Sequence, residues 1–335
     1  MNYTASAKAA KAQKEVRQVR YMAASQIKGI QMNVAAWIEK VQDELEAADL
    51  HFGHGTDNAG DEAAWLVLHS LGAELDGSFQ DWERQPSEDE AAIIQARLDS
   101  RLTGSQPLAY ILGTAWFAGL EFEVSPAVLV PRSPIGELVI EQFSPWMKAS
   151  SIGSVLDLCT GCGCIGISVA VYLPWARVDA TDISSAALKV ARRNVNKHNV
   201  AARVQLLQSD LFAALGGRRY DLVLSNPPYV AAETMLDLPS EYRSEPEIGL
   251  VSGADGLDAC LQILLQAPGY MTDSALLVCE VGESEHRLTE LLPSVPFLWL
   301  EFSHGGSGVF MLSRQQLLDS ATAIGQVTEE RRHVA

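Results

Sequence analysis

The sequence lacks a long apolar run and is short of positive charge. No stretch reaches the roughly 20 consecutive apolar residues that a membrane-spanning helix requires, and residues 1–20 contain no apolar core of a secretory signal. We therefore expect a cytoplasmic protein without a membrane partner. The 25 Lys and Arg residues are outnumbered by 42 Asp and Glu residues, which gives a net charge of −17. Such a surface disfavours nonspecific binding of nucleic acid.

Cysteine is also scarce, with five residues in a chain of 335. An odd number in a chain that is long enough to form a large core favours free thiols over a disulfide framework. Cys159, Cys162 and Cys164 lie close together, but no second pair of ligands follows at the spacing of a zinc site. Small side chains packed in a glycine-rich loop explain the cluster better, so we predict no metal.

The N-terminus is the exception to the acidic composition. Six Lys and Arg residues stand against one Glu in the first 28 residues. These residues form either a basic helix that touches RNA or an accessory tail, and the tail is the favoured interpretation. Any contact with nucleic acid is expected only here.

Residues 33–114 carry the periodicity of helices. Apolar residues recur every three or four positions from Val34 to Leu45, and Asn58 stands where it would cap a second apolar segment. Ser87 and Glu90 have the spacing of a capping box at the start of a third helix. These patterns predict a small helical domain.

The rest of the chain changes to strand-like patterns. Two short apolar segments separated by a glycine, within residues 115–124, predict a β-hairpin. From residue 154 onward, strand-like runs alternate with helical segments, which predicts an α/β fold with a doubly wound sheet. The expected strands span residues 155–159, 178–182, 204–207, 220–224 and 275–281, followed by a terminal hairpin-like pair at 297–302 and 309–312.

A glycine loop follows the first of these strands. Gly161 and Gly163 allow the backbone to approach a ligand closely and expose the amides at the start of the next helix. Asp182 ends the second strand, about 20 residues later, where a carboxylate can accept hydrogen bonds from ribose hydroxyls. Asp210, at the end of the third strand, is placed to bind an adenine amino group, with Leu211 and Phe212 as apolar walls.

The ligand of this loop is expected to be cationic. The loop lacks the full G-x-G-x-x-G pattern of a pyrophosphate site, and Asp157, immediately before it, would repel a phosphate. An acidic rim suits a sulfonium and an α-ammonium group better, so the pattern predicts an S-adenosylmethionine pocket. Its predicted residues are Asp157, Thr160, Gly161, Gly163, Asp182, Ile183, Asp210, Leu211 and Asn226.

The most distinctive segment is Ser225-Asn226-Pro227-Pro228-Tyr229, which follows the strand at 220–224. Its two prolines fix backbone angles and form a stiff ledge. The side-chain carbonyl of Asn226 and the backbone carbonyl of Pro227 offer two neighbouring acceptors for an NH2 group, and the ring of Tyr229 can pack on the flat group that carries it. An isolated motif of this kind is also compatible with an ordinary turn, but the upstream glycine loop favours a clamp for an amide or amine nitrogen.

We accordingly predict Asn226, Pro227 and Tyr229 as catalytic residues and Pro228 as a further substrate-binding residue. Arg132, which follows the extended segment 128–131, is a candidate contact for a cofactor carboxylate or an acidic side chain, and it is included among the substrate-binding residues. A solvated arginine beside a proline turn fits the sequence equally well.

The glycine loop, Asp182, Asp210 and the segment 226–229 together resemble the amino-methyltransferases of the seven-stranded Rossmann class. Further stretches resemble the protein-glutamine methyltransferases and, among them, the branch that acts on large-subunit ribosomal protein L3 rather than the release-factor branch. These stretches are Tyr110, Phe117-x-Gly119, Val130-Pro131-Arg132, Glu245-Pro246 and Gly282 for the family, and His54-Gly55-Thr56-Asp57-Asn58 and residues 131–138 for the branch. The resemblance covers residues 34–315.

The resemblance implies a seven-stranded Rossmann-like class I methyltransferase that methylates the side-chain amide nitrogen (N5) of a glutamine in this ribosomal protein. Between two tails that the resemblance does not cover, a basic one (1–32) and a C-terminal one (317–335), we expect a helical substrate-recognition domain (33–114), a hairpin linker (115–135) and a methyltransferase domain that uses S-adenosylmethionine (136–316). A basic ribosomal protein suits the acidic surface through electrostatic steering, and ribosome assembly is one setting in which the two would meet.

Three alternatives remain open at the level of sequence. A release-factor glutamine methyltransferase and a methyltransferase for exocyclic amines of nucleic acid would use the same clamp. The net charge of −17 and the lack of a basic recognition domain disfavour the latter. A non-catalytic ribosome-associated factor would retain the fold alone, and the intact Asn226 and Asp182 argue against it.

Overall fold

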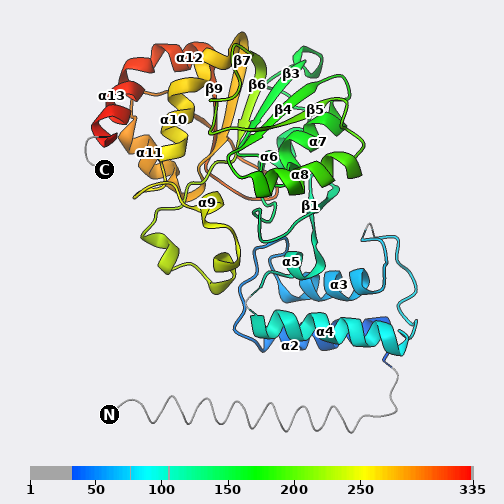
Figure 1. Ribbon diagram of the computed structural model, residues 1–335. Coiled ribbons are helices and arrows are strands. Elements are labelled where there is room, and N and C mark those ends of the chain that lie inside the picture. Colours follow the sequence, from blue (N-terminus) through cyan, green and yellow to red (C-terminus); the bar gives the residue numbers. More distant parts are fainter. Residues whose placement is uncertain (1–31, 76, 105, 333–335) are drawn as a thin grey trace, which may run out of the picture.

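The structure is a computed structural model, which describes residues 32–75, 77–104 and 106–332. The basic tail predicted at residues 1–32 lies outside the described residues, except for Met32. Across the described residues, no helix has both the length and the apolar character needed to cross a bilayer. A group of helices forms the N-terminal part, and a sheet flanked by helices forms the rest (Figure 1).

The N-terminal helices begin where polar side chains cap them. The side chain of Asn33 accepts a hydrogen bond from the amide of Ala36 at the start of the first of them, and Asn58 caps the second. The predicted capping box is present, because Ser87 N donates to Glu90 Oε2 at 2.8 Å and Glu90 N donates to Ser87 Oγ at 3.2 Å. These helices are α2 (Val34–Glu46), α3 (Ala59–Ser70), α4 (Glu88–Gly104) and α5 (Leu108–Leu112).

A short hairpin connects these helices to the sheet. It consists of β1 (Thr114–Phe117) and β2 (Leu120–Glu123), which pair antiparallel as predicted. Asn194, on α8 (Ser185–Lys197), fastens it to the second part of the chain: its Oδ1 accepts from Glu123 N at 2.7 Å and its Nδ2 donates to Glu123 O at 2.9 Å. The linker is therefore held against a helix of the sheet.

The sheet has seven strands in the order β5-β4-β3-β6-β7-β9-β8. The first five in this order run parallel, whereas β9 runs antiparallel to both β7 and β8. This arrangement confirms the predicted seven-stranded Rossmann-like α/β fold and its terminal antiparallel pair. The strands are β3 (Ser154–Leu158), β4 (Arg177–Asp182), β5 (Val204–Gln208), β6 (Tyr220–Ser225), β7 (Met271–Glu280), β8 (Leu298–Trp299) and β9 (Val309–Ser313).

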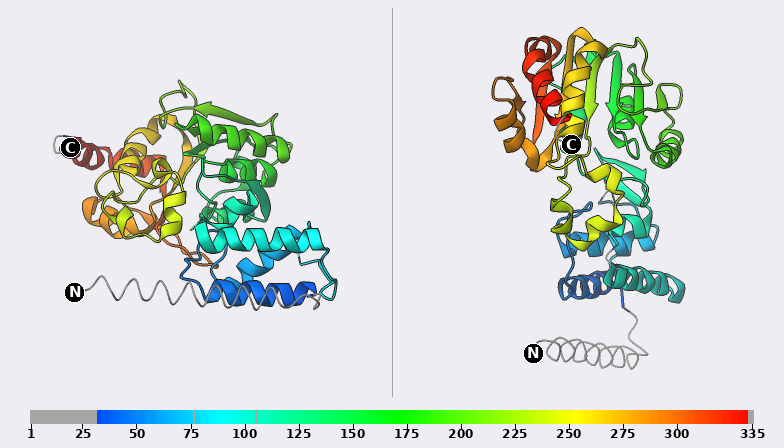
Figure 2. Two further views of the ribbon diagram at one scale, coloured as in Figure 1. Left: turned by 60° about the horizontal axis from the view of Figure 1, so that its bottom comes forward. Right: turned by 60° about the vertical axis from the view of Figure 1, so that its left-hand side comes forward.

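Both faces of the sheet are covered by helices, as Figure 2 shows from the side. In β3, Val155 packs in the cluster that includes Ile165 of α7, whereas Leu156 packs in the cluster that includes Leu261 of α10. Burial on both faces explains why these strands are continuous apolar runs in the sequence. The α-helices of this part are α6 (Ile135–Ile140), α7 (Cys164–Tyr172), α8, α9 (Glu247–Leu250), α10 (Asp258–Gln266), α11 (Glu285–Leu291), α12 (Arg314–Asp319) and α13 (Ala321–Arg332). Its 3-10 helices are η1 (Ala149–Ser151), η2 (Thr234–Leu236), η3 (Ser240–Ser244), η4 (Ala267–Tyr270) and η5 (Gly282–Ser284).

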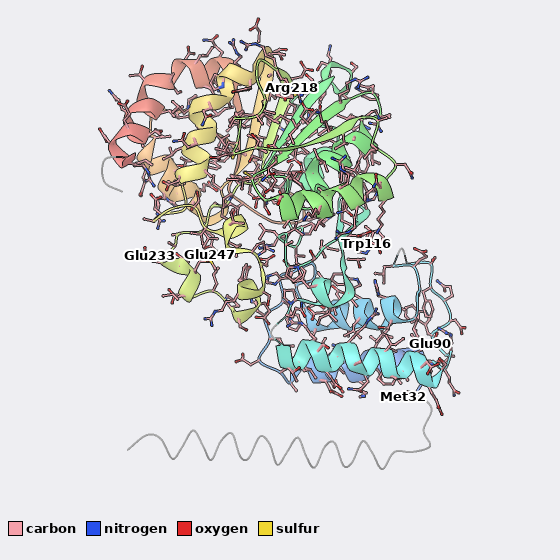
Figure 3. All side chains as sticks on the ribbon, viewed as in Figure 1. Met32, Glu90, Trp116, Arg218, Glu233 and Glu247 are labelled. Atoms are coloured by element: carbon pink, nitrogen blue, oxygen red, sulfur yellow. The ribbon has the colours of Figure 1, made fainter. Side chains whose placement is uncertain are left out.

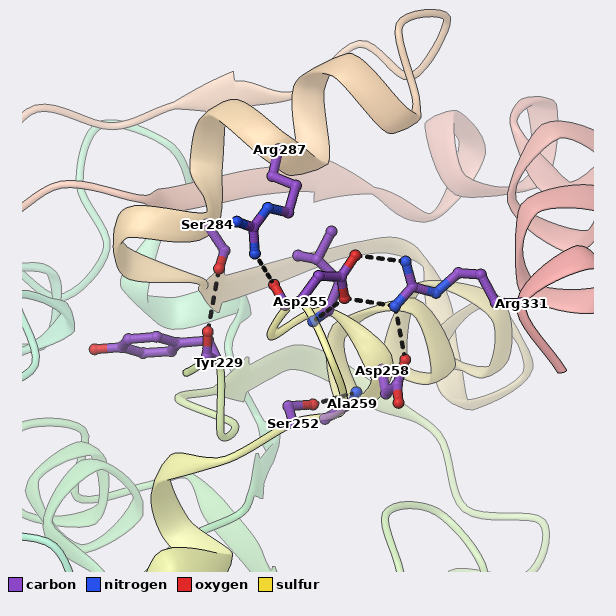
Figure 4. Close-up of polar contacts among 9 residues, drawn as sticks. Tyr229, Ser252, Asp255, Asp258, Ala259, Ser284, Arg287 and Arg331 are labelled. Carbon is purple, nitrogen blue, oxygen red and sulfur yellow. Dashed lines mark hydrogen bonds and ion pairs between the residues drawn. The ribbon is translucent and has the colours of Figure 1, made fainter. Parts of the chain in front are cut away.

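The residues predicted as a C-terminal tail are part of the fold instead. Leu317 of α12 and Ile324 of α13 are fully buried in the core on the α10 side of the sheet. At the end of α13, Arg331 Nη1 donates to Asp255 Oδ2 at 2.6 Å and its Nη2 donates to Asp258 Oδ1 at 2.9 Å (Figure 4). Apolar burial and these ion pairs hold residues 317–332 against α10.

Candidate active site

A cavity of about 400 Å³ lies at the carboxyl ends of the parallel strands. Its wall is built from the residues that follow β3, β4, β5 and β6, from the connector 127–133, and from the segment 246–252. Arg218, just before β6, lies at the end of the sheet away from the N-terminal helices (Figure 3), so β6 runs toward those helices and the cavity faces them. Chain connections leave β3 and β6 in opposite directions, which makes this the switch point where open α/β sheets bind ligands.

The two glycines of the glycine loop have left-handed backbone conformations. Gly161 and Gly163 have φ angles of +57° and +86°. Gly161 lines the cavity with Thr160, whereas Gly163, which was also predicted to bind the cofactor, does not belong to the wall. A Cβ atom on Gly163 would lie 2.8 Å from Cδ1 of Ile167, so a side chain there would be strained and would also clash. The loop therefore needs glycine both for its conformation and for its packing.

Asp157 lies beneath the loop and not at its rim, which corrects the expectation of an acidic rim at this position. It is fully buried, and it does not belong to the cavity wall. Its Oδ2 accepts hydrogen bonds from Thr160 Oγ1 and, at 2.9 Å, from Gly166 N. Burial raises the pKa of Asp157 to about 7, even though these two donors oppose the shift. Asp157 thus shapes the loop from below.

Asp182 lies at the wall, as the last residue of β4. Its Oδ2 accepts a hydrogen bond from Gly161 N at 2.9 Å and its Oδ1 accepts one from Ser184 N at 2.8 Å. Burial raises its pKa, and the two amide donors counteract part of this shift. One carboxylate therefore orders the glycine loop and the start of α8 while it faces the cavity.

The structure brings Ile183, Asp210 and Leu211 to the same cavity wall. Ile183 has 49% of its surface exposed, which is high for isoleucine, and its position provides an apolar platform beside Asp182. Phe212, in contrast, is fully buried and stacks on Tyr270 with ring centroids 4.7 Å apart. Phe212 is not part of the wall, so the prediction of an apolar wall holds for Leu211 alone.

Asn226 lies at the wall with a free acceptor. Its side-chain Oδ1 is buried and has no hydrogen-bond partner in the part of the chain that the structure describes. Buried polar atoms without partners are rare in folded proteins, so each one calls for an explanation. At a cavity wall, a ligand that supplies the missing partner is such an explanation. Pro228 and Tyr229 also line the cavity, whereas Pro227 is buried and does not.

Arg132 is paired with a carboxylate that lies 113 positions further along the chain. Its Nη1 and Nη2 donate to Oε1 and Oε2 of Glu245, both at 2.7 Å, and Val130 N also donates to Oε1 at 2.9 Å. Burial alone would raise the pKa of Glu245, but the nearby His54 ring and Arg132 lower it to about 2. Arg132 therefore lines the cavity as half of a bidentate ion pair.

Comparison with known proteins places this geometry in a family. The methyltransferase small domain family matches residues 137–239, and the PrmC N-terminal domain family matches residues 37–113. The ribosomal protein uL3 glutamine methyltransferase of Xylella fastidiosa is 45% identical over 284 residues, which cover 85% of this chain and 91% of that protein. The proteins of the same name from Xanthomonas campestris and Francisella tularensis are 46% and 42% identical, over 85% and 82% of this chain and 92% and 88% of theirs. The chain belongs to the family of these ribosomal protein uL3 glutamine methyltransferases.

Family membership confirms the predicted resemblance and the predicted enzyme class, a protein-glutamine methyltransferase. It does not by itself assign roles to single residues. Among the residues near the cavity, Ser133 and Glu280 were not predicted as site residues, although Ser133 belongs to the stretch 131–138 that carries the resemblance to the branch. Ser133 stands in a proline-rich connector and Glu280 at the end of an apolar strand, and neither position carries a local pattern that indicates a site.

Proposed function

We propose that this chain transfers a methyl group from S-adenosylmethionine to the side-chain amide nitrogen of a glutamine in ribosomal protein uL3. The observation that carries the proposal is the unpartnered, buried Oδ1 of Asn226 at the wall of a cavity next to a glycine loop. An acceptor in this position fits an N–H donor on the substrate. The names of the relatives point to glutamine of uL3 as the group that brings this donor.

The residues at the wall suit S-adenosylmethionine. Asp182 has both carboxylate oxygens at the switch point, where ribose hydroxyls can donate to them, and Ile183 and Leu211 offer apolar surface for an adenine ring. Gly161 leaves open space at the wall where a side chain would otherwise project, and Asp210 provides a carboxylate for the adenine amino group. When bound, S-adenosylmethionine supplies an electrophilic methyl group on a sulfonium.

The contribution of the protein is to position a poor nucleophile. The lone pair of an amide nitrogen is delocalised into its carbonyl, so the nitrogen must be held in place and its pyramidal form favoured. Asn226 Oδ1 accepts one N–H, and Tyr229 and Pro228 limit the orientation of the amide plane. The backbone carbonyl of Pro227 would accept the second N–H, although this residue does not line the cavity. No strong base is needed among these residues, because a methylated nitrogen that still carries the extra proton loses it readily to water.

The remaining proposals concern the partner and the parts of the chain. The net charge of −17 favours the approach of a basic protein such as one that binds ribosomal RNA. We assign substrate recognition to residues 33–114, the linker to 115–135 and methyl transfer to 136–316. We place the reaction in the cytoplasm during ribosome assembly. We expect contact with nucleic acid only through the basic N-terminal segment.

The test is a methyl-transfer assay with three acceptors. The purified chain is incubated with S-adenosylmethionine and with uL3, a release factor or ribosomal RNA, and the products are analysed by mass spectrometry. We expect a gain of about 14 Da on one glutamine of uL3. Methylation of the release factor alone, or of RNA alone, would contradict the proposed substrate. Methylation of none of the three would contradict the proposed function.

A second prediction tests the cofactor site separately from the acceptor. Asp182→Ala should weaken S-adenosylmethionine binding about 100-fold, because hydrogen bonds to a charged group contribute roughly 1.5–3 kcal/mol each. Equilibrium dialysis with labelled cofactor measures the change. The matched control is Asp179→Asn on the same strand, since Asp179 pairs with Arg218 and Tyr220 at the opposite end of the sheet. Equal affinities of Asp182→Ala and the control would argue against the assigned role.

A further inference from the structure

Glu280 is a buried carboxyl group beside the candidate site, and its partners include a residue of the clamp. Only 4% of its surface is exposed, and it stands at the carboxyl end of β7. Tyr229 Oη donates to its Oε1 at 3.0 Å, and Ser133 Oγ donates to its Oε2 at 2.5 Å. Burial raises the pKa of Glu280, and the two hydroxyl donors moderate this shift. Burial of a carboxyl group is costly, so a group retained at such a position, with no cation of the described residues bonded to it, requires an explanation.

The ring of Tyr229 is fixed by more than its hydroxyl. A Cβ atom on Gly282 would lie 2.6 Å from Cε2 of Tyr229, so the ring packs directly on the backbone of this glycine, which has a φ of +48°. The backbone oxygen of Tyr229 accepts a hydrogen bond from Ser284 Oγ at 3.1 Å (Figure 4). The turn after β7 therefore contacts the ring and the backbone carbonyl of Tyr229, while Glu280 accepts a hydrogen bond from its hydroxyl.

The Glu280 carboxylate also links the segment 225–229 to the connector that carries Arg132. Ser133 Oγ, besides donating to Glu280, accepts a hydrogen bond from Ile135 N at 3.2 Å at the start of α6. Arg132 and Ser133 are neighbours, so the Arg132–Glu245 pair and the Ser133–Glu280 hydrogen bond fix two adjacent residues of one connector. Both Ser133 and Tyr229 line the cavity, and Glu280 lies behind them.

From this geometry we propose that Glu280 is a positioning residue for methyl transfer, which sets the location of the Tyr229 ring at the cavity wall through the tyrosine hydroxyl. The inference depends on the proposed function, in which Tyr229 limits the orientation of the substrate amide. Glu280 has no contact with the substrate in this scheme. Its effect on turnover passes entirely through Tyr229 and Ser133.

The test combines Glu280→Leu, Glu280→Gln and Tyr229→Phe with the double variant Tyr229→Phe/Glu280→Leu. Leucine fills similar space but accepts no hydrogen bond, so Glu280→Leu should lower kcat about 30- to 100-fold, the range expected for a small misplacement of a positioning group. Affinity for S-adenosylmethionine should stay within about threefold.

Glutamine can still bond both hydroxyls, so Glu280→Gln should recover most of the turnover. In the Tyr229→Phe background, Glu280→Leu should cost less than it does alone, because the bond from Tyr229 is already absent and only the bond from Ser133 is still lost.

Tyr220→Phe is the matched control. Tyr220 Oη also donates to a carboxylate, Asp179 Oδ2, at 2.8 Å, but Tyr220 begins β6 and so lies at the opposite end of this strand from Asn226. This variant should lose stability without losing turnover. Crystal structures of Glu280→Leu and of the unaltered protein supply a readout that does not depend on the substrate, and they should show a displaced Tyr229 ring in the variant.

Three results would overturn the proposal: unchanged turnover in Glu280→Leu, a full additional loss in the Tyr229→Phe background, or an unmoved Tyr229 ring in the crystal structure. These results differ from a failure of the proposed function, in which the unaltered protein itself would not methylate uL3. In that case the position of the Tyr229 ring in the crystal structures still decides the role of Glu280.

Discussion

Replacing Asn226 with alanine should reduce turnover about 1,000-fold or more and leave the affinity for S-adenosylmethionine within a few-fold of the unaltered protein. The side-chain oxygen of Asn226 is a buried acceptor at the cavity wall without a hydrogen-bond partner among the described residues. Loss of one preorganised hydrogen-bonding group at a reacting centre typically costs 10²- to 10³-fold, and loss of orientation adds to this. Single-turnover methylation of uL3 and equilibrium dialysis of the cofactor measure the two quantities separately.

Asn226→Asp refines the same experiment. A carboxylate keeps two acceptor oxygens at nearly the same place but adds a negative charge next to the expected sulfonium. We expect tighter cofactor binding together with lower turnover, because attraction for the bound cation is not an interaction specific to the transition state. Asn196→Ala, on the exposed surface of α8, is the control for loss of an asparagine side chain. A parallel fall of cofactor affinity and turnover in Asn226→Ala would contradict the role assigned to this residue.

The fold was predictable where local patterns determine structure. The capping residues Asn58 and Ser87 begin helices as expected, because a side chain that satisfies free backbone amides is a local feature. The alternation of apolar strands and helices from residue 154 predicted the doubly wound sheet, since each strand is buried on both faces. The segment 317–332 was misjudged, because its burial depends on Leu317 and Ile324 meeting a core formed elsewhere in the chain.

The candidate site was predictable only in part. The glycine loop, Asp182 and the segment 226–229 each follow a strand, and strand ends on the same edge of a sheet must meet. The burial of the Asp157 side chain beneath the loop was not predictable. A residue near the end of a strand can face either the ligand or the core, and an apolar run in the sequence does not distinguish these two orientations. The pairs Arg132–Glu245 and Tyr229–Glu280 join residues 113 and 51 positions apart, and no local signal links them.

The second large effect is expected from Arg101, which joins the N-terminal helices to the part of the chain that forms the cavity. Arg101 has 1% of its surface exposed. Its Nε donates to Glu62 Oε1 at 2.6 Å, its Nη1 donates to Glu241 Oε1 at 3.2 Å, and its Nη2 donates to His51 O at 2.9 Å. Burial opposes ionisation of Glu241, but bonds from the His51 amide and from Arg101 outweigh it and keep its pKa below the usual value.

Arg101→Met should therefore lower the free energy of unfolding by about 3–5 kcal/mol, because two buried carboxylates lose the cation that compensates them. Urea denaturation at pH 7 measures the change. Arg193→Met is the matched control, since the Arg193–Glu123 pair is exposed and such pairs contribute less than about 1 kcal/mol.

Arg101→Met combined with Glu62→Leu and Glu241→Leu should recover most of the lost stability, because no buried charge then remains unpaired. Glu241 belongs to η3, shortly before the residues that line the cavity, so the restored triple variant should still turn over uL3 more slowly than the unaltered protein. Full turnover in that variant would show that the junction stabilises the fold without aligning the two parts of the chain for catalysis.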